Sequence, residues 1–439
     1  MVFHLCKGTF LGIGLFLFGC ASPSGTSSSK PDDSVETSPA ESEETVESLP
    51  PIPSIEAITS QVNTECTENG CIQQVTYIGA YDRETVDEWA AYGSNIQNGY
   101  SVWLVQFATH GTQARATITL PLDVQYPENG FHVILNNPLT VGVASRCAPG
   151  AGSVGAGLAA QFGSQGLVGV AIDYPGLGSA GTHPYLVAES EAKAALDGAR
   201  ATLNFLEYAQ VPHSKKLALT GLSQGGHATL SAASLHRTYA PELDIKAFAA
   251  AAPSNMFLEF WTPYINTDGT HLTFYALIAL AWSHYYDYST AGVFNEARRS
   301  QIEEAILSLC LIEDEGVETL WDRLGTSAEE IFTEQFRDAF SSGDFTNFPA
   351  FELGFAANRL VPFEQTAPIK IYQGIWDYTV PPESTQILIA SLREGGMDIQ
   401  YEEIPLANHL NTAFGFIVTY QLAGSSSLHW LRGQLNAEN

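Results

Sequence analysis

The spacing of apolar residues changes along the chain, and a first pattern runs from residue 72 to residue 255. Short apolar runs alternate with polar turns, and the run at 166–174 is apolar almost throughout, which is typical of a strand buried on both faces of a parallel sheet. Residues 189–209 instead repeat apolar side chains at helical spacing. Further strands are expected at 72–81, 101–107, 114–122, 131–137, 216–221 and 245–253, and a second helix at 225–240. Strands that alternate with helices predict a mainly parallel α/β sheet flanked by helices.

A second pattern, aromatic and helical, occupies residues 256–364. Strand signals then return at 368–374 and 398–405. Because the strand pattern continues after the helical block, we interpret the block as a cap inserted into the sheet domain; a separate helical domain is the alternative. The expected organisation is a core in two parts, 54–255 and 365–439, with the cap between them.

The first 53 residues follow neither pattern. An apolar run that is too short to span a bilayer as a mature helix ends in Leu17-Phe18-Gly19-Cys20. This ending resembles the lipobox of bacterial lipoproteins, in which the signal is cleaved before a cysteine that then carries lipid. We therefore expect a signal peptide at 1–19, a lipidated Cys20 that attaches the protein to a membrane, and a disordered acidic tether over 20–53. An ordinary signal peptide or a membrane anchor is the alternative.

The net charge of the chain and its predicted export limit the expected binding partners and the expected cellular location. The chain has 48 acidic and 19 basic side chains, a net charge of −29. Nucleic acid is therefore not expected as a partner, because phosphate binding needs clustered lysine and arginine. Ala21 after the lipidated cysteine is not an inner-membrane retention signal, which favours the outer membrane, on its periplasmic or its surface face.

Four cysteines remain after the signal peptide and Cys20, and an even set in an exported chain indicates disulfides. Cys66 and Cys71 are separated by a stretch that contains the turn-forming pair Asn69-Gly70. Among the three possible pairings the sequence favours Cys66–Cys71 with Cys147–Cys310. A zinc site is the alternative, but no CxxC pair or histidine spacing supports it.

A candidate nucleophile stands where a predicted strand meets a predicted helix. Gly221-Leu222-Ser223-Gln224-Gly225 has the pattern G-x-S-x-G, and in this context the pattern predicts a nucleophile elbow. The tight turn requires small residues on both sides of the serine, and the N-terminus of the following helix faces a developing oxyanion. A plain strand-to-helix turn is the alternative.

A serine needs a base that is held by an acid, and α/β-hydrolase folds supply them in the chain order Ser, Asp or Glu, His, each after a strand. Asp377 follows the strand expected at 368–374, and His409 follows the one at 398–405. Glu383 is an alternative acid, farther along and behind two prolines. The remaining histidines considered lie in the wrong chain order or in the cap, and His227, one helical turn after Ser223, is expected to pack or to hydrogen-bond locally.

Several stretches resemble the secretory lipase family, which includes yeast lipase A enzymes with large helical caps. They are Cys147-Ala148-Pro149, the run "AIDYPGLGSAGTHPYLVAESEAKAALDGARA" at 171–201, and "GLSQGGHA" at the elbow. The resemblance is strong over 130–230 and implies an α/β-hydrolase fold with an inserted helical cap. It also implies a disulfide between the loop of Cys147 and the cap, which agrees with Cys147–Cys310.

The resemblance also indicates where an oxyanion hole would form. One backbone N–H comes from Gln224, directly after the nucleophile, and the other comes from Thr140 in the loop after the strand at 131–137. Pro138-Leu139 stands where the family has His-Gly, so the shape of this loop is left open. His110-Gly111-Thr112 spells the family's loop motif too, but it lies between two strand-like runs and is expected to be a hairpin turn.

These features predict a serine hydrolase that cleaves carboxylic esters, either a lipase or a shorter-chain esterase, on an ester or lipid substrate and with no metal or organic cofactor. An alternative with the same fold is a peptidase or amidase of the prolyl oligopeptidase type, although no propeller repeat precedes the catalytic region. A further alternative is a surface lipoprotein that binds without catalysing.

Overall fold

The structure of the protein is a computed structural model that describes residues 52–89, 96–151, 153–255, 257–314, 316–410, 412 and 427–437. The predicted signal peptide, Cys20 and nearly all of the predicted tether lie outside these residues. Within them, no helix is both long enough and apolar enough to cross a membrane.

Nine strands of the described chain form one sheet, in the order β1-β2-β3-β5-β4-β6-β7-β8-β9. The first three strands and the β3–β5 pair are antiparallel, and every pair from β5 to β9 is parallel. The strands are β1 (Ile72–Tyr81), β2 (Tyr100–Thr109), β3 (Thr112–Pro121), β4 (Phe131–Asn137), β5 (Val168–Asp173), β6 (His213–Leu222), β7 (Asp244–Ala251), β8 (Ile369–Gly374) and β9 (Ile399–Ile404). The prediction of a mainly parallel sheet is confirmed.

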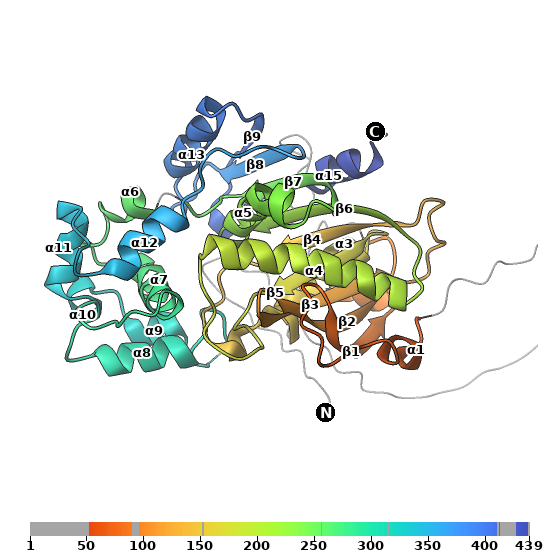
Figure 1. Ribbon diagram of the computed structural model, residues 1–439, viewed down its shortest axis with the longest axis horizontal. Coiled ribbons are helices and arrows are strands. Elements are labelled where there is room, and N and C mark those ends of the chain that lie inside the picture. Colours follow the sequence, from red (N-terminus) through yellow and green to blue (C-terminus); the bar gives the residue numbers. More distant parts are fainter. Residues whose placement is uncertain are drawn as a thin grey trace, which may run out of the picture.

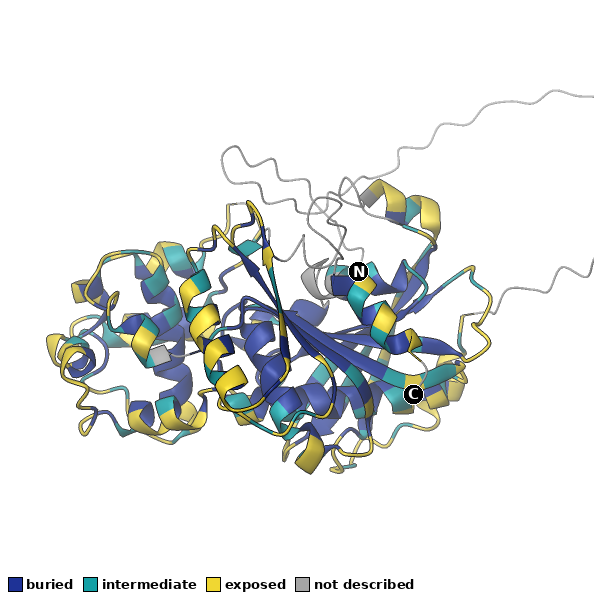
Figure 2. Cartoon of the chain, turned by 90° about the horizontal axis from the view of Figure 1, so that it is seen from above, coloured by how far each residue is buried: buried dark blue, intermediate teal, exposed yellow. Residues whose placement is uncertain are grey.

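Helices cover both faces of this sheet because its strands alternate their side chains between two apolar clusters. Val133 and Leu135 of β4 join a cluster with residues of α4 and α5, whereas Ile134 joins a second cluster with Phe162 of α3 and Leu431 of α15. Figure 2 shows the central strands as buried along most of their length. The helices of the core are α1 (Ile55–Thr59), α2 (Arg83–Trp89), α3 (Ser153–Gly163), α4 (Ala188–Tyr208), α5 (Gln224–Tyr239), α13 (Pro382–Glu394) and α15 (Ser427–Asn436), with 3-10 turns η1 (Ser145–Cys147) and η2 (Pro149–Ala151).

The stretch His110-Gly111-Thr112 is a hairpin turn, as predicted. Thr109 of β2 pairs with Thr112 of β3, and the two residues between them, His110 and Gly111, have φ values of 43° and 73°. Two consecutive positive φ values are characteristic of the two-residue turns that match the twist of antiparallel strands. This motif therefore belongs to the sheet and is not part of an oxyanion loop.

The helical block between β7 and β8 packs around an apolar cluster distinct from the two on the sheet faces, and Val143 and residues 185–187 of the sheet domain also join it. Many of its side chains are aromatic: Trp261 stacks on Tyr275 at 4.1 Å between ring centroids, and Phe336 and Phe351 lie 4.8 Å apart. Most of the aromatic residues noted in the sequence therefore pack against one another. The helices are α6 (Phe257–Trp261), α7 (His271–Tyr285), α8 (Arg299–Ser308), α9 (Leu320–Leu324), α10 (Ala328–Ile331), α11 (Glu334–Ser342) and α12 (Pro349–Ala357), gathered at one end of the molecule in Figure 1.

The chain leaves the sheet for this block and returns to the neighbouring position. β7 precedes the block, β8 follows it, and the two strands pair in parallel.

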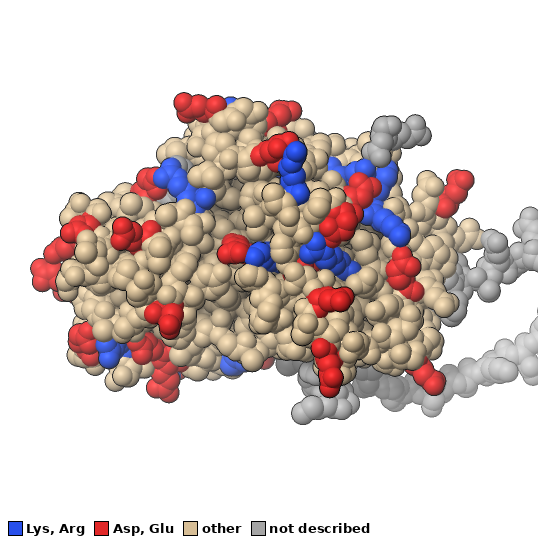
Figure 3. Space-filling view, in the orientation of Figure 1, with Lys and Arg blue, Asp and Glu red and all other residues tan. Residues whose placement is uncertain are grey.

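Acidic side chains are spread over both the helical block and the sheet domain on the face seen in Figure 3, so the negative charge is not confined to one element.

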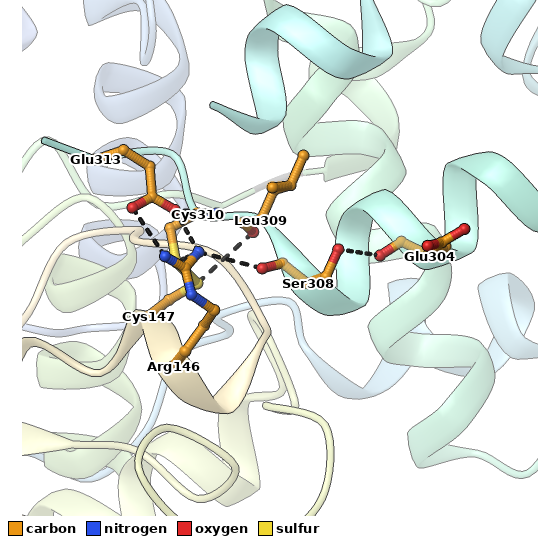
Figure 4. Close-up of a disulfide and its surroundings, with 7 residues drawn as sticks. All are labelled: Arg146, Cys147, Glu304, Ser308, Leu309, Cys310 and Glu313. Carbon is orange, nitrogen blue, oxygen red and sulfur yellow. Dashed lines mark hydrogen bonds and ion pairs between the residues drawn. A yellow bond between two sulfur atoms is a disulfide. The ribbon is translucent and has the colours of Figure 1, made fainter. Parts of the chain in front are cut away.

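The described part of the chain contains two disulfides, Cys66–Cys71 and Cys147–Cys310, with Cα atoms 6.3 and 5.4 Å apart. The second disulfide joins the loop after β4 to Cys310, the second residue after α8. Beside it, Arg146 forms an ion pair with Glu313 and donates to the Ser308 carbonyl at 3.2 Å (Figure 4). The loop after β4 and the helical block are therefore tied covalently and by charge.

Removing the Cys147–Cys310 bridge should destabilise the protein more than removing the Cys66–Cys71 bridge. In the chain-entropy account, a bridge that closes 163 residues restricts the unfolded chain by about 5 kcal/mol and one that closes 5 residues by about 2 kcal/mol. Guanidinium unfolding of the double alanine variants of each pair measures both losses of unfolding free energy. Equal losses, or a larger loss for the short loop, would contradict this expectation.

Candidate active site

Ser223 lies in a strained turn between β6 and α5. Its φ and ψ are 85° and −105°, a region that side-chain-bearing residues rarely adopt. Backbone hydrogen bonds hold the turn: Ser223 N donates to the Ala251 carbonyl at 3.0 Å, and the Ser223 carbonyl accepts from His227 N at 2.9 Å and Ser254 N at 3.1 Å. Ser223 is only 6% exposed and lies at the carboxyl end of a central strand.

The glycines around Ser223 are required by close backbone contacts. A Cβ on Gly221 would overlap the Gly225 carbonyl, a Cβ on Gly225 would overlap the Asn137 carbonyl, and a Cβ on Gly226 would overlap the Ala251 carbonyl. The elbow is therefore packed between the ends of β4 and β7. This packing explains why the sequence pattern has small residues at these positions.

The structure brings Asp377 and His409 together. They follow the neighbouring strands β8 and β9, and the two loops are joined by a hydrogen bond from Trp376 N to the Ala407 carbonyl at 2.9 Å. His409 Nδ1 lies 2.7 Å from Asp377 Oδ2. Because β6, β8 and β9 are parallel strands of one sheet, Ser223 and this pair all lie at the same carboxyl edge.

The carboxylate of Asp377 is fixed by further donors. Its Oδ1 accepts from Thr379 N and Val380 N, both at 2.9 Å, and its Oδ2 accepts from Gln373 Nε2 at 3.3 Å. The residue is 1% exposed. Glu383, the alternative acid, is an exposed residue in the first turn of α13.

This geometry assigns the tautomer of His409. The carboxylate of Asp377 is an acceptor, so Nδ1 of His409 carries the hydrogen and Nε2 is left as the nitrogen that can take up a proton. A neutral imidazole held in this way is suited to act as a general base.

The loop after β4 abuts the elbow, since the Asn137 carbonyl lies against Gly225. Leu139 has a negative φ, so its backbone does not need the freedom of glycine; the positive φ in this loop, 124°, is at Gly142. Thr140 is buried, and its Oγ1 lies 2.9 Å from the hydroxyl of Tyr185. Pro138-Leu139 is thus accommodated without a strained leucine.

Gln224 begins α5, and its buried side chain contacts residues that the sequence did not single out as functional. Its amide lies 2.6 Å from His183 Nε2 and 2.8 Å from Glu191 Oε1. His227 was expected to pack or to hydrogen-bond locally. It is fully buried, and its hydrogen-bond partners are distant in sequence: Nδ1 pairs with Glu191 and Nε2 with the Asn358 carbonyl. The available signal was indirect: His183 and Glu191 both lie within the run at 171–201 that resembles the family.

Comparisons with known proteins agree with this fold. A family model described as "Secretory lipase" matches residues 158–438. A Mycobacterium tuberculosis (strain CDC 1551 / Oshkosh) protein named as a "Probable inactive lipase" is 26% identical over 237 residues, 54% of this chain and 49% of that protein. The chain therefore spans about half of that relative's length.

Solved structures are similar over most of the chain. A mutant of the rice cell wall degrading esterase LipA from Xanthomonas oryzae has a TM-score of 0.66 at 20% identity, covering 83% of this chain and 96% of that one. Candida antarctica lipase A in its closed state has a TM-score of 0.60 at 16% identity, covering 88% and 93%. The predicted α/β-hydrolase fold is confirmed.

Proposed function

Since the chain belongs to the secretory lipase family, whose model matches residues 158–438, we propose that it hydrolyses carboxylic esters through an acyl-enzyme formed on Ser223. The observation that carries the proposal is the 2.7 Å hydrogen bond between His409 and the buried Asp377, at the sheet edge that also carries the strained Ser223 turn. Acyl transfer by a serine requires a nucleophile, a base that takes its proton, and an acid that holds the base in place.

The proposed reaction assigns one role to each residue. Ser223 Oγ attacks the ester carbonyl while His409 Nε2 takes its proton and then passes it to the leaving alcohol. Asp377 holds the ring orientation and stabilises the imidazolium that forms. A water, activated by His409 in turn, hydrolyses the acyl-enzyme and releases the carboxylic acid.

The oxyanion of the tetrahedral intermediate needs two donors. Gln224 N, at the start of α5, is the first, and Thr140 N, in the loop that lies against the elbow, is the second. The N-terminus of α5 adds a favourable dipole at the same place. We expect the acyl chain to be apolar, as in a lipase or a shorter-chain esterase, because the family model that the chain matches describes secretory lipases.

Membership in a family described as secretory supports export, and the two disulfides are consistent with an oxidising compartment. We propose that the chain is anchored by lipid on Cys20 and held away from an outer membrane by the 20–53 tether. Mass spectrometry of the N-terminal peptide from membranes would detect the acylated cysteine; an unmodified N-terminus beyond residue 20 would exclude this anchor.

An activity-based probe tests the proposed reaction on the full chain. A fluorophosphonate reacts with an activated serine, and peptide mapping should find the adduct on Ser223. p-Nitrophenyl esters of increasing acyl length then separate esterase from lipase, and a peptide anilide tests the peptidase alternative. A chain that neither reacts nor turns over any of these substrates would contradict the proposal and favour a binding protein.

A further inference from the structure

Residues 183–191, from the end of the β5–α4 loop to the first turn of α4, contact both halves of the proposed oxyanion hole. Three buried side chains of this segment make the contacts: His183, Tyr185 and Glu191. The proposed reaction gives none of them a chemical step. Their hydrogen bonds reach Gln224 on one side and Thr140 on the other.

His183 accepts a hydrogen bond from the side chain of Gln224. Burial lowers the pKa of His183 to about 3, so the ring is neutral. Its Nδ1 lies 3.1 Å from the Pro175 carbonyl and must be the donor, which leaves Nε2 to accept from Gln224 Nε2 at 2.6 Å. The ring also stacks on Tyr174, with 5.2 Å between centroids and 7° between planes. The acceptor is therefore fixed in both position and tautomer.

Glu191 takes the second hydrogen of the same amide. Its Oε1 accepts from Gln224 Nε2 at 2.8 Å and from Leu186 N at 2.9 Å, and its Oε2 lies 2.7 Å from His227 Nδ1. The carboxylate is completely buried, and a buried carboxylate is stable only when it is hydrogen-bonded and paired in this way. Both hydrogens of the Gln224 amide are thus used by the segment.

Thr140, the second proposed oxyanion donor, contacts the same segment through Tyr185. Burial raises the pKa of Tyr185, so the hydroxyl keeps its proton, and it lies 2.9 Å from Thr140 Oγ1. Next to it, the Tyr174 hydroxyl donates to the Pro138 carbonyl at 3.3 Å. These bonds hold the unusual Pro138-Leu139 stretch from behind.

The network continues to the end of the cap. His227 Nε2 donates to the Asn358 carbonyl at 3.0 Å, and Asn358 Oδ1 accepts from Ala188 N at 3.0 Å. Asn358 follows α12 directly, and its Nδ2 donates to the Tyr286 hydroxyl at 3.1 Å. The cap is therefore connected to the residue after the nucleophile through buried polar contacts.

We propose that the 183–191 segment positions both donors of the oxyanion hole, with Glu191 and His183 acting on Gln224 and Tyr185 acting on Thr140. The proposal rests on the proposed ester hydrolysis. The three side chains are positioning residues: they act through Gln224 and Thr140 and do not touch the substrate. Gln224 is the better held of the two residues, since both hydrogens of its side-chain amide are bound.

The first test compares Glu191→Ala and Gln224→Ala with the wild-type full chain on a p-nitrophenyl ester. A displaced oxyanion donor lowers kcat, so each variant is expected to lose about 100-fold in kcat with KM nearly unchanged. Affinity for an alkylboronic acid, which forms a tetrahedral adduct on a serine, should fall in parallel, while affinity for the product carboxylate should not. Folded variants with wild-type kcat would overturn the proposal.

The double variant Glu191→Ala with Gln224→Ala distinguishes positioning from a general structural effect. If Glu191 acts through Gln224, its loss adds little once the Gln224 side chain is gone. Losses that multiply would show that Glu191 acts by another route and would overturn the proposal for this residue.

Glu191→Gln is the conservative variant that keeps the proposal testable if the alanine variant does not fold. Its amide oxygen can accept from Gln224 and Leu186, and its NH₂ can donate to a neutral His227, so the hydrogen-bond geometry is retained without the charge. We expect kcat within a few-fold of wild type. A loss as large as that of Gln224→Ala would contradict a role that depends on geometry.

Tyr185→Phe tests the Thr140 half, and Tyr239→Phe is its matched control. The Tyr239 hydroxyl donates to Asp197 Oδ2 at 2.8 Å, and Tyr239 is the last residue of α5, at the end opposite the elbow. Tyr185→Phe should lower kcat and boronate affinity, whereas the control variant should not. Equal effects in the two variants would overturn the proposed role of Tyr185.

A wild-type chain with neither ester turnover nor probe labelling would instead overturn the proposed function, and this inference with it.

Discussion

Ser223→Ala should lower kcat for a p-nitrophenyl ester by about 10⁴- to 10⁶-fold and abolish fluorophosphonate labelling. In the proposed reaction the Ser223 hydroxyl bonds to the acyl carbon, so no acyl-enzyme is expected to form without it. The strained φ of 85° belongs to the backbone and is held by the hydrogen bonds to Ala251 and Ser254, which an alanine keeps. The variant is therefore expected to fold with an unfolding midpoint close to that of the wild type.

Ser234→Ala is a suitable control for this substitution. Ser234 lies on the same helix, and its hydroxyl donates to the Ser231 carbonyl at 2.8 Å. Steady-state kinetics and probe labelling of the two variants, side by side, make the comparison. Labelling that persists in Ser223→Ala would show that another residue is the nucleophile.

Asp377→Asn should lower kcat by about 10⁴-fold near neutral pH. The amide oxygen can replace only one carboxylate oxygen. Thr379 N and Val380 N both donate at 2.9 Å to Oδ1, so the oxygen should face them and the NH₂ should face His409. His409 Nδ1 must then accept, which places the hydrogen on Nε2 and leaves no base for Ser223.

Glu383→Gln is the control for this prediction, because Glu383 is the alternative acid and is exposed in α13. Its kcat should match that of the wild type in the same ester assay. An active Asp377→Asn chain together with an inactive Glu383→Gln chain would reverse the assignment of the acid.

The sequence predicted those elements whose signal is local. The apolar run around β5 indicates a strand buried on both faces, and the strand-to-helix change at Ser223 indicates an elbow, without knowledge of any distant contact. Asp377 and His409 could be selected because each follows a strand in the expected order. The strand order of the sheet and the two apolar clusters on its faces could be seen only in the structure, because strand pairing depends on contacts between segments that are distant in sequence.

The contacts around Gln224 could not be predicted in this way. They join residues from three separate segments, at 183–191, 224–227 and 358, and buried polar side chains have no periodicity to reveal them. A lone buried histidine or glutamate looks the same in a sequence whether it supports a fold or a site. His227 illustrates the point: its position on α5 indicated packing or local hydrogen bonding, and although the side chain is buried, its hydrogen-bond partners lie 36 and 131 residues away.

The ties between the loop after β4 and the helical block have a consequence for the design of chimeric proteins. Besides the Cys147–Cys310 bridge and the Arg146–Glu313 pair, Leu311 N donates to the Val141 carbonyl at 2.9 Å, one residue after Thr140. A foreign helical block grafted between β7 and β8 without these partners would leave a free thiol at Cys147 and an unpaired carbonyl at Val141, next to Thr140. The helical block and the loop should therefore be exchanged together in recombination, even though 163 residues separate their cysteines.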